Sequence, residues 1–124
     1  MKVKIDTKEK FIVLTPNEEH LSDNLTEELS QTIQSFLNSN TKNIVLSLKD
    51  VKNIDNAALA LLANLQQEFY EHNASFIICE MNSLIEEKLN DLKLLETMNV
   101  TPTETEAADI VQMEEIEREL NDEI

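Results

Sequence analysis

Glycine is absent from this sequence of 124 residues, where average usage of about 7% would give roughly nine. Several kinds of site depend on glycine, because a residue without a Cβ lets the backbone approach a phosphate closely. The absence excludes a phosphate-binding P-loop, a dinucleotide-binding fingerprint and a nucleophile elbow of the G-x-S-x-G type. Asparagines near element ends are the next best candidates for left-handed turns. They are Asn38, Asn40, Asn73, Asn82 and Asn99.

Positive charge is scarce: 10 lysines and arginines stand against 25 acids, for a net charge of −15. Nucleic acid and anionic membrane surfaces are therefore poor partners, since both need clustered basic side chains. The charge is also uneven. Residues 104–124 hold nine acids and a single base, Arg118, whereas four of the ten bases lie within residues 1–10.

Groups that bind metals or act as nucleophiles are few. The only cysteine is Cys79, and the only histidines are His20 and His72. Their spacing matches no metal site or catalytic triad, so we expect no metal, no cofactor and no enzymatic activity. Cys79 lies in the apolar run "FIIC" and is expected to act as a small buried hydrophobe. Both histidines are expected to be solvated, at a loop or a helix end.

Long hydrophobic runs are missing as well. No segment approaches the roughly 20 apolar residues of a membrane helix, and the start "MKVKIDTKEKFIVL" has no signal-peptide h-region. We therefore expect a cytoplasmic protein without membrane insertion. Hydrophobic residues still make up 41% of the chain, which is sufficient for one globular domain over residues 1–124.

Alternating helical and strand-like patterns predict an α/β fold. "KVKID" and "FIVLT" are expected to form a hairpin, "NIVLSL" and "SFIICE" buried central strands, and "NVT" a short last strand. Helices are expected at about 24–36, 56–72, 83–96 and 104–122. Ser22–Asn24 should supply the first N-cap, and Ser83 with Glu86, like Thr103 with Glu106, should form capping boxes.

The acidic last helix allows two interpretations. Its apolar residues form one narrow stripe, which comprises Ala107, Ile110, Val111, Met113, Ile116 and Leu120. Either the helix is solvated and buries this thin stripe against the domain, or the stripe docks on a partner or on a second copy of the chain.

The junction "NIDNAALALLANL", Asn53 to Leu65, lies where α/β proteins usually place their functional residues. Asp55 ends a strand-like run and precedes a helix, so its side chain is expected to cap the helix N-terminus. This structural role is sufficient by itself. The functional alternative is that the exposed rim of the junction recognises a partner.

The segment from Lys42 to Val100 resembles the STAS domain of anti-sigma factor antagonists, and the order of elements matches over nearly the whole chain. The sharpest match is "VKNIDNAALALL", Val51 to Leu62, against the family pattern V-x-x-I-D-S-S-G-L. The resemblance implies a small mixed β-sheet of four to five strands, with about four α-helices packed mainly on one face. The last of these helices is the acidic one at about 104–122.

In that family, a serine of the D-S-S-G junction is phosphorylated by a partner kinase that is also the anti-sigma factor. The phosphate blocks binding by its charge at the helix N-terminus. Laid on this chain, the aspartate is Asp55, the first serine is Asn56, the phosphoacceptor is Ala57 and the glycine is Ala58. Ala57 has no hydroxyl group, so it cannot be phosphorylated as the family's serine is.

The resemblance implies a non-enzymatic protein-binding domain in a bacterial partner-switching pathway that regulates transcription. Its partner would be an anti-sigma factor or kinase-like ATPase domain. The expected partner-binding rim comprises Ile54, Asp55, Asn56, Ala57, Ala58 and Leu59. The protein would be a constitutive antagonist, a module regulated elsewhere, or a descendant with a different partner. The alternative function is an accessory subunit of a membrane transporter such as a lipid-transport ATPase.

A homodimer formed through the first helix or the acidic last helix is a further alternative. Ser47 and Ser83 are other candidate modification sites, although their positions in a strand and at a helix start favour structural roles.

Overall fold

The N-terminal strands form the predicted hairpin. The computed structural model describes residues 1–122 and begins with β1 (Val3–Thr7) and β2 (Ile12–Pro16). The two strands pair antiparallel with Ile5 opposite Leu14, and the N–H of Lys8 donates to the carbonyl of Phe11 in the turn. β2 is buried along its whole length, whereas β1 is an edge strand that carries the exposed Lys4. Lysines on an edge strand oppose pairing with another chain.

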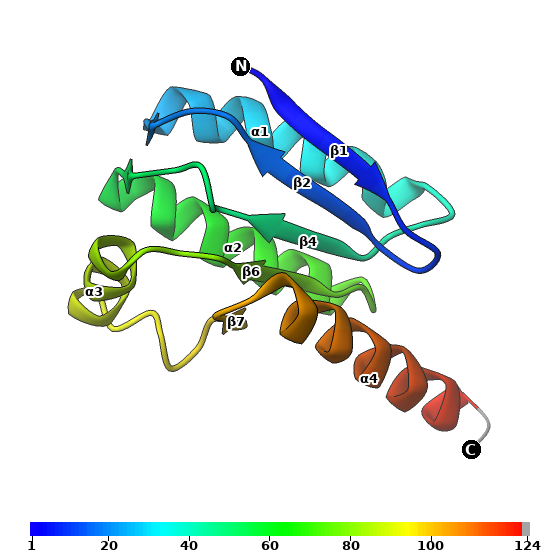
Figure 1. Ribbon diagram of the computed structural model, residues 1–124. Coiled ribbons are helices and arrows are strands. Elements are labelled where there is room, and N and C mark those ends of the chain that lie inside the picture. Colours follow the sequence, from blue (N-terminus) through cyan, green and yellow to red (C-terminus); the bar gives the residue numbers. More distant parts are fainter. Residues whose placement is uncertain (123–124) are drawn as a thin grey trace.

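A five-stranded mixed sheet is the centre of the fold (Figure 1). β4 (Ile44–Ser47) and β6 (Phe76–Cys79) lie in its middle, and β7 (Val100–Thr101) forms the second edge, in the order β1-β2-β4-β6-β7. β2, β4, β6 and β7 are parallel, so helices must return the chain between them. The residues of β4 and β6 are all buried. The mixed α/β architecture confirms the expected fold class.

The two faces of the sheet are covered differently. Leu14, Leu46 and Ile78 pack on one face with α1 (Asp23–Ser35), α2 (Asn56–Glu71) and α3 (Ser83–Asp91). A single 3₁₀ turn, η1 (Phe36–Asn38), follows α1. The alternate residues Val45 and Ile77 face the opposite side, where α4 (Glu104–Asp122) packs. Three helices therefore cover one face and α4 covers the other.

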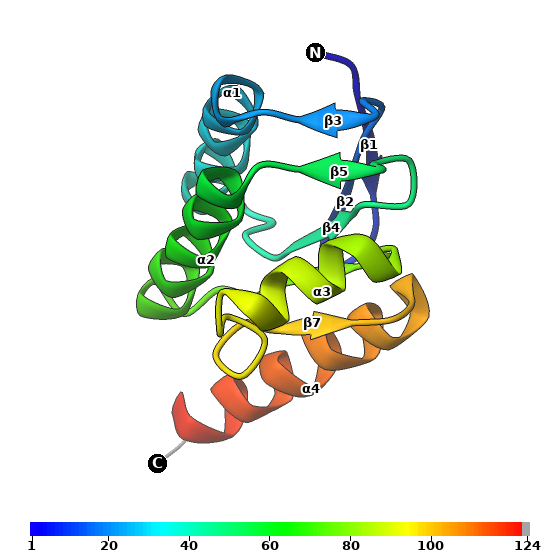
Figure 2. The same cartoon turned by 90° about the vertical axis from the view of Figure 1, so that its left-hand side faces the viewer.

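A second, two-stranded parallel sheet was not predicted. It pairs β3 (His20–Leu21) with β5 (Asn53–Ile54), and Figure 2 shows the two strands side by side above α3. Two residues are too few for a hydrophobic period to show in the sequence. Leu21 and Ile54 are fully buried, and the pairing positions the chain that enters α1 beside the chain that enters α2.

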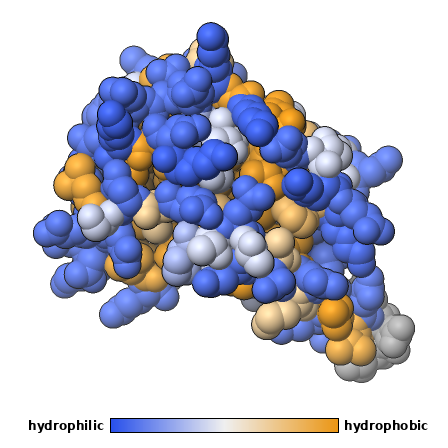
Figure 3. Space-filling view, viewed as in Figure 1, coloured by the Kyte–Doolittle hydropathy of each residue, from blue (hydrophilic) through white to orange (hydrophobic). Residues whose placement is uncertain are grey.

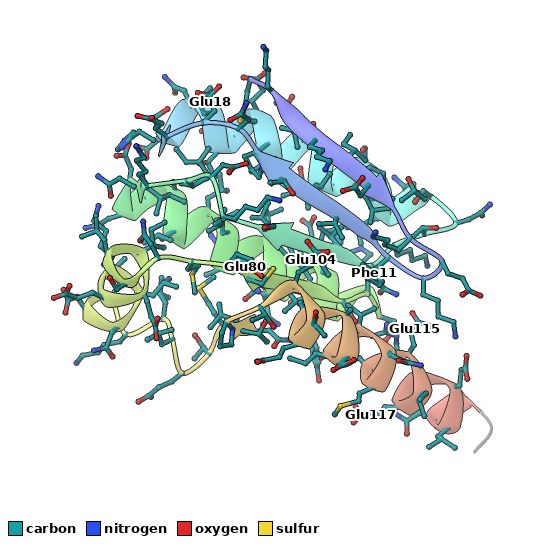
Figure 4. All side chains as sticks on the ribbon, viewed as in Figure 1. Phe11, Glu18, Glu80, Glu104, Glu115 and Glu117 are labelled. Carbon is teal, nitrogen blue, oxygen red and sulfur yellow. The ribbon has the colours of Figure 1, made fainter. Side chains whose placement is uncertain are left out.

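Turns and caps without glycine follow the prediction only in part. Among the described residues, positive φ occurs at Asn73, Glu80 and Lys93, so only one of the five candidate asparagines adopts it. Glu80 is further held by its carboxylate, which accepts a hydrogen bond of 2.7 Å from the N–H of Glu104 at the start of α4. Figure 4 shows these two glutamates close together. The Glu80 side chain thereby satisfies one of the N–H groups that a helix start leaves unpaired.

Two of the four predicted N-caps are correct. The hydroxyl of Ser22 accepts from the N–H of Leu25, and that of Thr103 accepts from the N–H of Glu106. The third is wrong by one residue, because Asn82 rather than Ser83 caps α3 through the N–H of Ile85. Within residues 1–122, no helix combines the length and apolar character needed to cross a membrane.

Candidate functional site

The junction between β5 and α2 divides the six predicted rim residues into two groups. Asn56 and Ala57, in the first turn of α2, are exposed, and Asp55 is partly exposed. Ile54, Ala58 and Leu59 are buried in the large core, so a partner cannot contact them in this conformation. The accessible part of the rim is Asp55–Ala57, and the buried three residues support it from below.

Asp55 is the N-cap residue of α2, but its carboxylate does not cap the helix. It accepts a hydrogen bond of 2.7 Å from Nε2 of His20, in β3. The expectation that its side chain caps α2 is therefore wrong, whereas His20 is exposed as expected but lies in β3 and also pairs with Asp55. The physical reason is the β3–β5 pairing, which places His20 opposite Asn53 and within reach of Asp55.

The backbone around Asp55 is nevertheless well ordered by hydrogen bonds. Its N–H donates to the carbonyl of Leu21, and its own carbonyl accepts from the N–H of Leu59. Because the carboxylate is turned to His20, the first turn of α2 has no side-chain cap. Unpaired N–H groups and the helix dipole give such an end a partial positive charge.

Helix α3 borders the rim and is tied to β5. Lys88 donates from Nζ to Oδ1 of Asn53 at 2.6 Å and to the carbonyl of Ile54 at 3.0 Å. Asn82 donates to the carbonyl of Lys52. Leu84, in the first turn of α3, is exposed. These contacts hold α3 against the strand that leads into the rim. Sequence reasoning missed this arrangement because β5 itself carries no detectable pattern.

The other sequence candidates divide into buried and exposed residues. Ser47 is fully buried in β4, and its hydroxyl has no hydrogen-bond partner among the described residues. Ser83 is exposed at the first position of α3. Cys79 is buried as expected, and burial, with the nearby carboxylates of Glu80 and Glu104, raises the pKa of its thiol to about 12. A protonated, enclosed thiol is a poor nucleophile.

His72 completes the short inventory of possible metal ligands. It follows the end of α2, where its Nδ1 lies 2.8 Å from the carbonyl of Glu68, so it is an exposed helix-end residue as expected. Within residues 1–122, no three histidine, cysteine, aspartate or glutamate side chains come together as a metal site would require.

Fold and junction together define a small α/β domain whose candidate site is an exposed helix start. The family model for the STAS domain matches residues 2–107. The chain therefore belongs to the STAS domain family. No curated protein sequence matches the chain. The family model ends near the first turn of α4, so most of that helix lies beyond it.

Solved structures give the same fold at low sequence identity. An anti-sigma factor antagonist from Mycobacterium paratuberculosis superposes with a TM-score of 0.77 at 15% identity, covering 90% of this chain and 93% of that one. The Bacillus cell fate determinant SpoIIAA in its phosphorylated form gives 0.65 at 15%, covering 89% and 99%. The murine anion transporter Slc26a9 gives 0.70 at 14%, covering 84% of this chain but 18% of the transporter.

Proposed function

We propose that this STAS domain is a non-enzymatic, protein-binding regulator that acts like an anti-sigma factor antagonist in a partner-switching pathway. Its partner is an anti-sigma factor or a kinase-like ATPase domain, and its binding rim is Asp55–Ala57 at the start of α2. The observation that carries the proposal is the position of Ala57: it is exposed at the first turn of α2, in a chain that belongs to the STAS family.

Ala57 occupies the place of the family's phosphoacceptor serine and has no hydroxyl group. A phosphate there would add nearly two negative charges beside the helix start and disrupt an interface. Since alanine cannot accept phosphate, the rim stays uncharged except for Asp55, which is paired with His20. We therefore propose that the domain binds its partner constitutively, with any control exercised through another residue or through the partner.

Two observations support a binding role over catalysis. The exposed residues that follow Asp55 are an asparagine and an alanine, which offer neither a nucleophile nor a general base. The thiol of Cys79 is enclosed in the core and protonated at neutral pH. The net charge of −15 agrees with a protein partner rather than nucleic acid. We propose that the domain acts in the cytoplasm.

The first prediction concerns Ala57 itself. Ala57→Glu introduces a charge where the family carries phosphate, so we expect partner affinity to fall by roughly tenfold or more, about 1.4 kcal/mol or above. Stability should change little because the side chain is exposed. The measurement is a pull-down of the tagged protein from its source cells, followed by titration of the recovered partner against both variants.

Gln31→Glu is the matched control, since it adds one negative charge on the exposed face of α1, away from the rim. It should leave affinity unchanged. Recovery of an anti-sigma factor or kinase-like ATPase that Ala57→Glu releases and Gln31→Glu retains supports the proposal. Equal affinity of both variants contradicts the rim, and recovery of transporter subunits makes the domain a transporter accessory instead.

A further inference from the structure

Helix α4 presents a second surface, at the opposite end of the molecule from the rim. The sequence suggested one apolar stripe on this helix, but the structure divides it between two sides. Ala107 and Val111 are fully buried against the sheet. Met113, Ile116 and Leu120 are 58%, 49% and 57% exposed. Their spacing of three and four residues places them on one side of the helix over two turns.

We propose that this outer side of α4 docks a basic amphipathic helix of another protein. The docking surface consists of Met113, Ile116 and Leu120 together with the acids around them. Figure 3 shows hydrophobic atoms gathered over the C-terminal part of α4, beside strongly hydrophilic neighbours. These three residues are among only seven large apolar side chains exposed within residues 1–122. The proposal goes beyond the rim and does not depend on it.

Charge determines the chemistry of the occupant. The exposed charged residues along this side of α4 are all acids: Glu106, Asp109, Glu117 and Glu119. Figure 4 shows Glu117 on the side of α4 away from Glu115, which faces the sheet. An apolar stripe between carboxylates complements a helix whose own apolar stripe is bordered by lysines and arginines.

An open groove continues the surface toward α2. It measures about 420 Å³ and is lined on one side by Tyr70 and Glu71 and on the other by Glu114 and Glu117. Tyr70 is 78% exposed. Arg118 also lines the groove, but the carboxylate of Glu115 lies 2.9 Å from its guanidinium and offsets its positive charge. A tyrosine ring among carboxylates suits the end of a lysine or arginine side chain.

The docking surface is held rigidly by the opposite side of α4. The guanidinium of Arg118 donates to Oδ1 of Asn43 and to the hydroxyl of Ser75, each at 3.2 Å. Glu115 accepts from Asn43 at 2.6 Å, and Glu114 accepts from Ser75 at 2.6 Å. These bonds join the C-terminal half of α4 to the starts of β4 and β6. Preorganisation of this kind lowers the entropy cost of binding.

A second copy of this chain is a poor occupant. Two-fold pairing of α4 with itself would bring the same carboxylates against one another, in a protein of net charge −15. The lysine-rich segment 1–10 of another copy offers only Ile5 as an exposed large apolar side chain. It cannot fill a stripe of three anchors, whereas a helix with apolar residues at matching intervals can.

The test uses the intact protein and a helical leucine–lysine peptide of about 15 residues, with its leucine–glutamate counterpart as the control probe. Fluorescence anisotropy should give a dissociation constant on the order of micromolar for the basic peptide, because three anchors form a small interface. The acidic peptide should not bind. The combined substitution Met113→Ser, Ile116→Ser and Leu120→Ser should weaken basic-peptide binding at least tenfold.

Matched controls locate the binding. Ile5→Ser with Leu84→Ser removes exposed apolar side chains elsewhere and should change affinity less than twofold. Glu117→Gln with Glu119→Gln should weaken binding more than Glu86→Gln with Glu87→Gln, which removes equal charge from exposed positions of α3. Ala57→Glu should bind the peptide normally, so that failure of the rim hypothesis and failure of this one are distinguishable.

Four outcomes would overturn the proposal. They are undetectable binding of the basic peptide, equal binding of the acidic peptide, equal losses in the stripe and control variants, and a wild-type dimer in light scattering that the serine substitutions in α4 dissociate. The last would show that the occupant is a second copy.

Discussion

The two faces of the β-sheet are held by different forces. On the face of α1, α2 and α3, twenty-one buried residues of the described chain form one continuous core. On the face of α4, six do so, and the polar network around Arg118 adds to the attachment. The large core fixes the candidate rim at the start of α2. The small core with its network leaves the outer side of α4 apolar and open.

On α4, the residues buried in the core and the residues proposed to bind a partner lie on different sides of the helix. A helix that satisfies its core contacts with Ala107 and Val111 has no structural need for exposed methionine, isoleucine and leucine further along. Hydrogen bonds, rather than apolar contacts, hold its C-terminal half to the sheet. Five predictions follow, from the largest expected effect to the smallest.

Adjacent residues of β6 offer a matched pair, because Ile77 and Ile78 face opposite sides of the sheet and both are buried. Ile78→Ala should lower the free energy of unfolding by about 2–5 kcal/mol through lost burial and a cavity in the large core. Ile77→Ala should lie at the lower end of that range, since α4 can relax over the small core. Urea unfolding measures both variants.

Hydrogen exchange should then distinguish where each variant opens. Ile77→Ala is expected to lose protection mainly in α4, and Ile78→Ala throughout the sheet. Uniform loss in both variants would mean that the two faces unfold as one unit.

Arg118→Met tests the polar attachment directly. It removes three hydrogen bonds to Asn43, Ser75 and Glu115 while keeping a long apolar side chain. We expect the local opening free energy of α4 to fall by about 1–3 kcal/mol, because partly buried acceptors lose a charged donor. Amide exchange in residues 111–121 measures it. Lys49→Met removes an exposed positive charge elsewhere and should leave these rates unchanged.

Acid should act on the same network. Hydrogen bonds from Asn43 and from Arg118 hold the pKa of Glu115 below its ordinary value of 4.5. A carboxylate with a lowered folded pKa contributes stability above the ordinary value and loses it as the pH falls through the folded one. The protection factors of the α4 amides should therefore fall in that acid range, and Arg118→Met should show less of this dependence. Identical acid profiles would contradict the role of Arg118.

Alkali should act on the core through Cys79. Its pKa is about 12 in the fold against 9.0 ordinarily, so the unfolded thiol ionises first. The protonated thiol makes its full contribution to the free energy of unfolding below pH 9, and this contribution falls as the pH rises from 9 toward 12. At pH 10 ionisation of the unfolded thiol should lower the free energy of unfolding by about 1 kcal/mol, a loss that Cys79→Ala does not show. Parallel urea titrations of the two proteins at pH 7 and pH 10 measure the difference, and a pH-independent difference would contradict burial of the thiol.

His20→Ala should have the smallest effect. The side chains of His20 and Asp55 are 48% and 41% exposed, so loss of their pair should lower the free energy of unfolding by about 0–1 kcal/mol. Thermal unfolding measures this. If the pair orients the rim, partner affinity should fall more than stability does, and Lys52→Ala, which breaks the exposed pair with Glu19, is the control. A loss of stability well above 1 kcal/mol would make the pair structural.

Features that depend on residues close together in the sequence were predicted well. The hairpin, the buried strands β4 and β6, and the caps at Ser22 and Thr103 follow from periodicity or from a hydrogen bond three residues away. The STAS resemblance rested on the junction from Val51 to Leu62 and on the order of elements, and the family match confirms it. The role of that junction in binding stays a prediction.

What the sequence missed at the two candidate surfaces has one cause, which is contact between distant segments. Asp55 faces His20 across thirty-five positions of sequence, and that contact exists only because β3 pairs with β5. The division of the α4 stripe into buried and exposed sides likewise depends on where the sheet ends beneath the helix. Neither could be read from spacing alone.

The sequence by itself determined most of the elements and their order, the family, and the lack of reactive groups at Asn56 and Ala57, because each is encoded within one segment or by absent residue types. Only the tertiary structure decided which side chains are accessible. It buried Ile54, Ala58 and Leu59 beneath the rim, turned Asp55 to His20, and left Met113, Ile116 and Leu120 in solvent. The physical reason is that accessibility is a property of the surfaces that segments present to one another, and no single segment contains it.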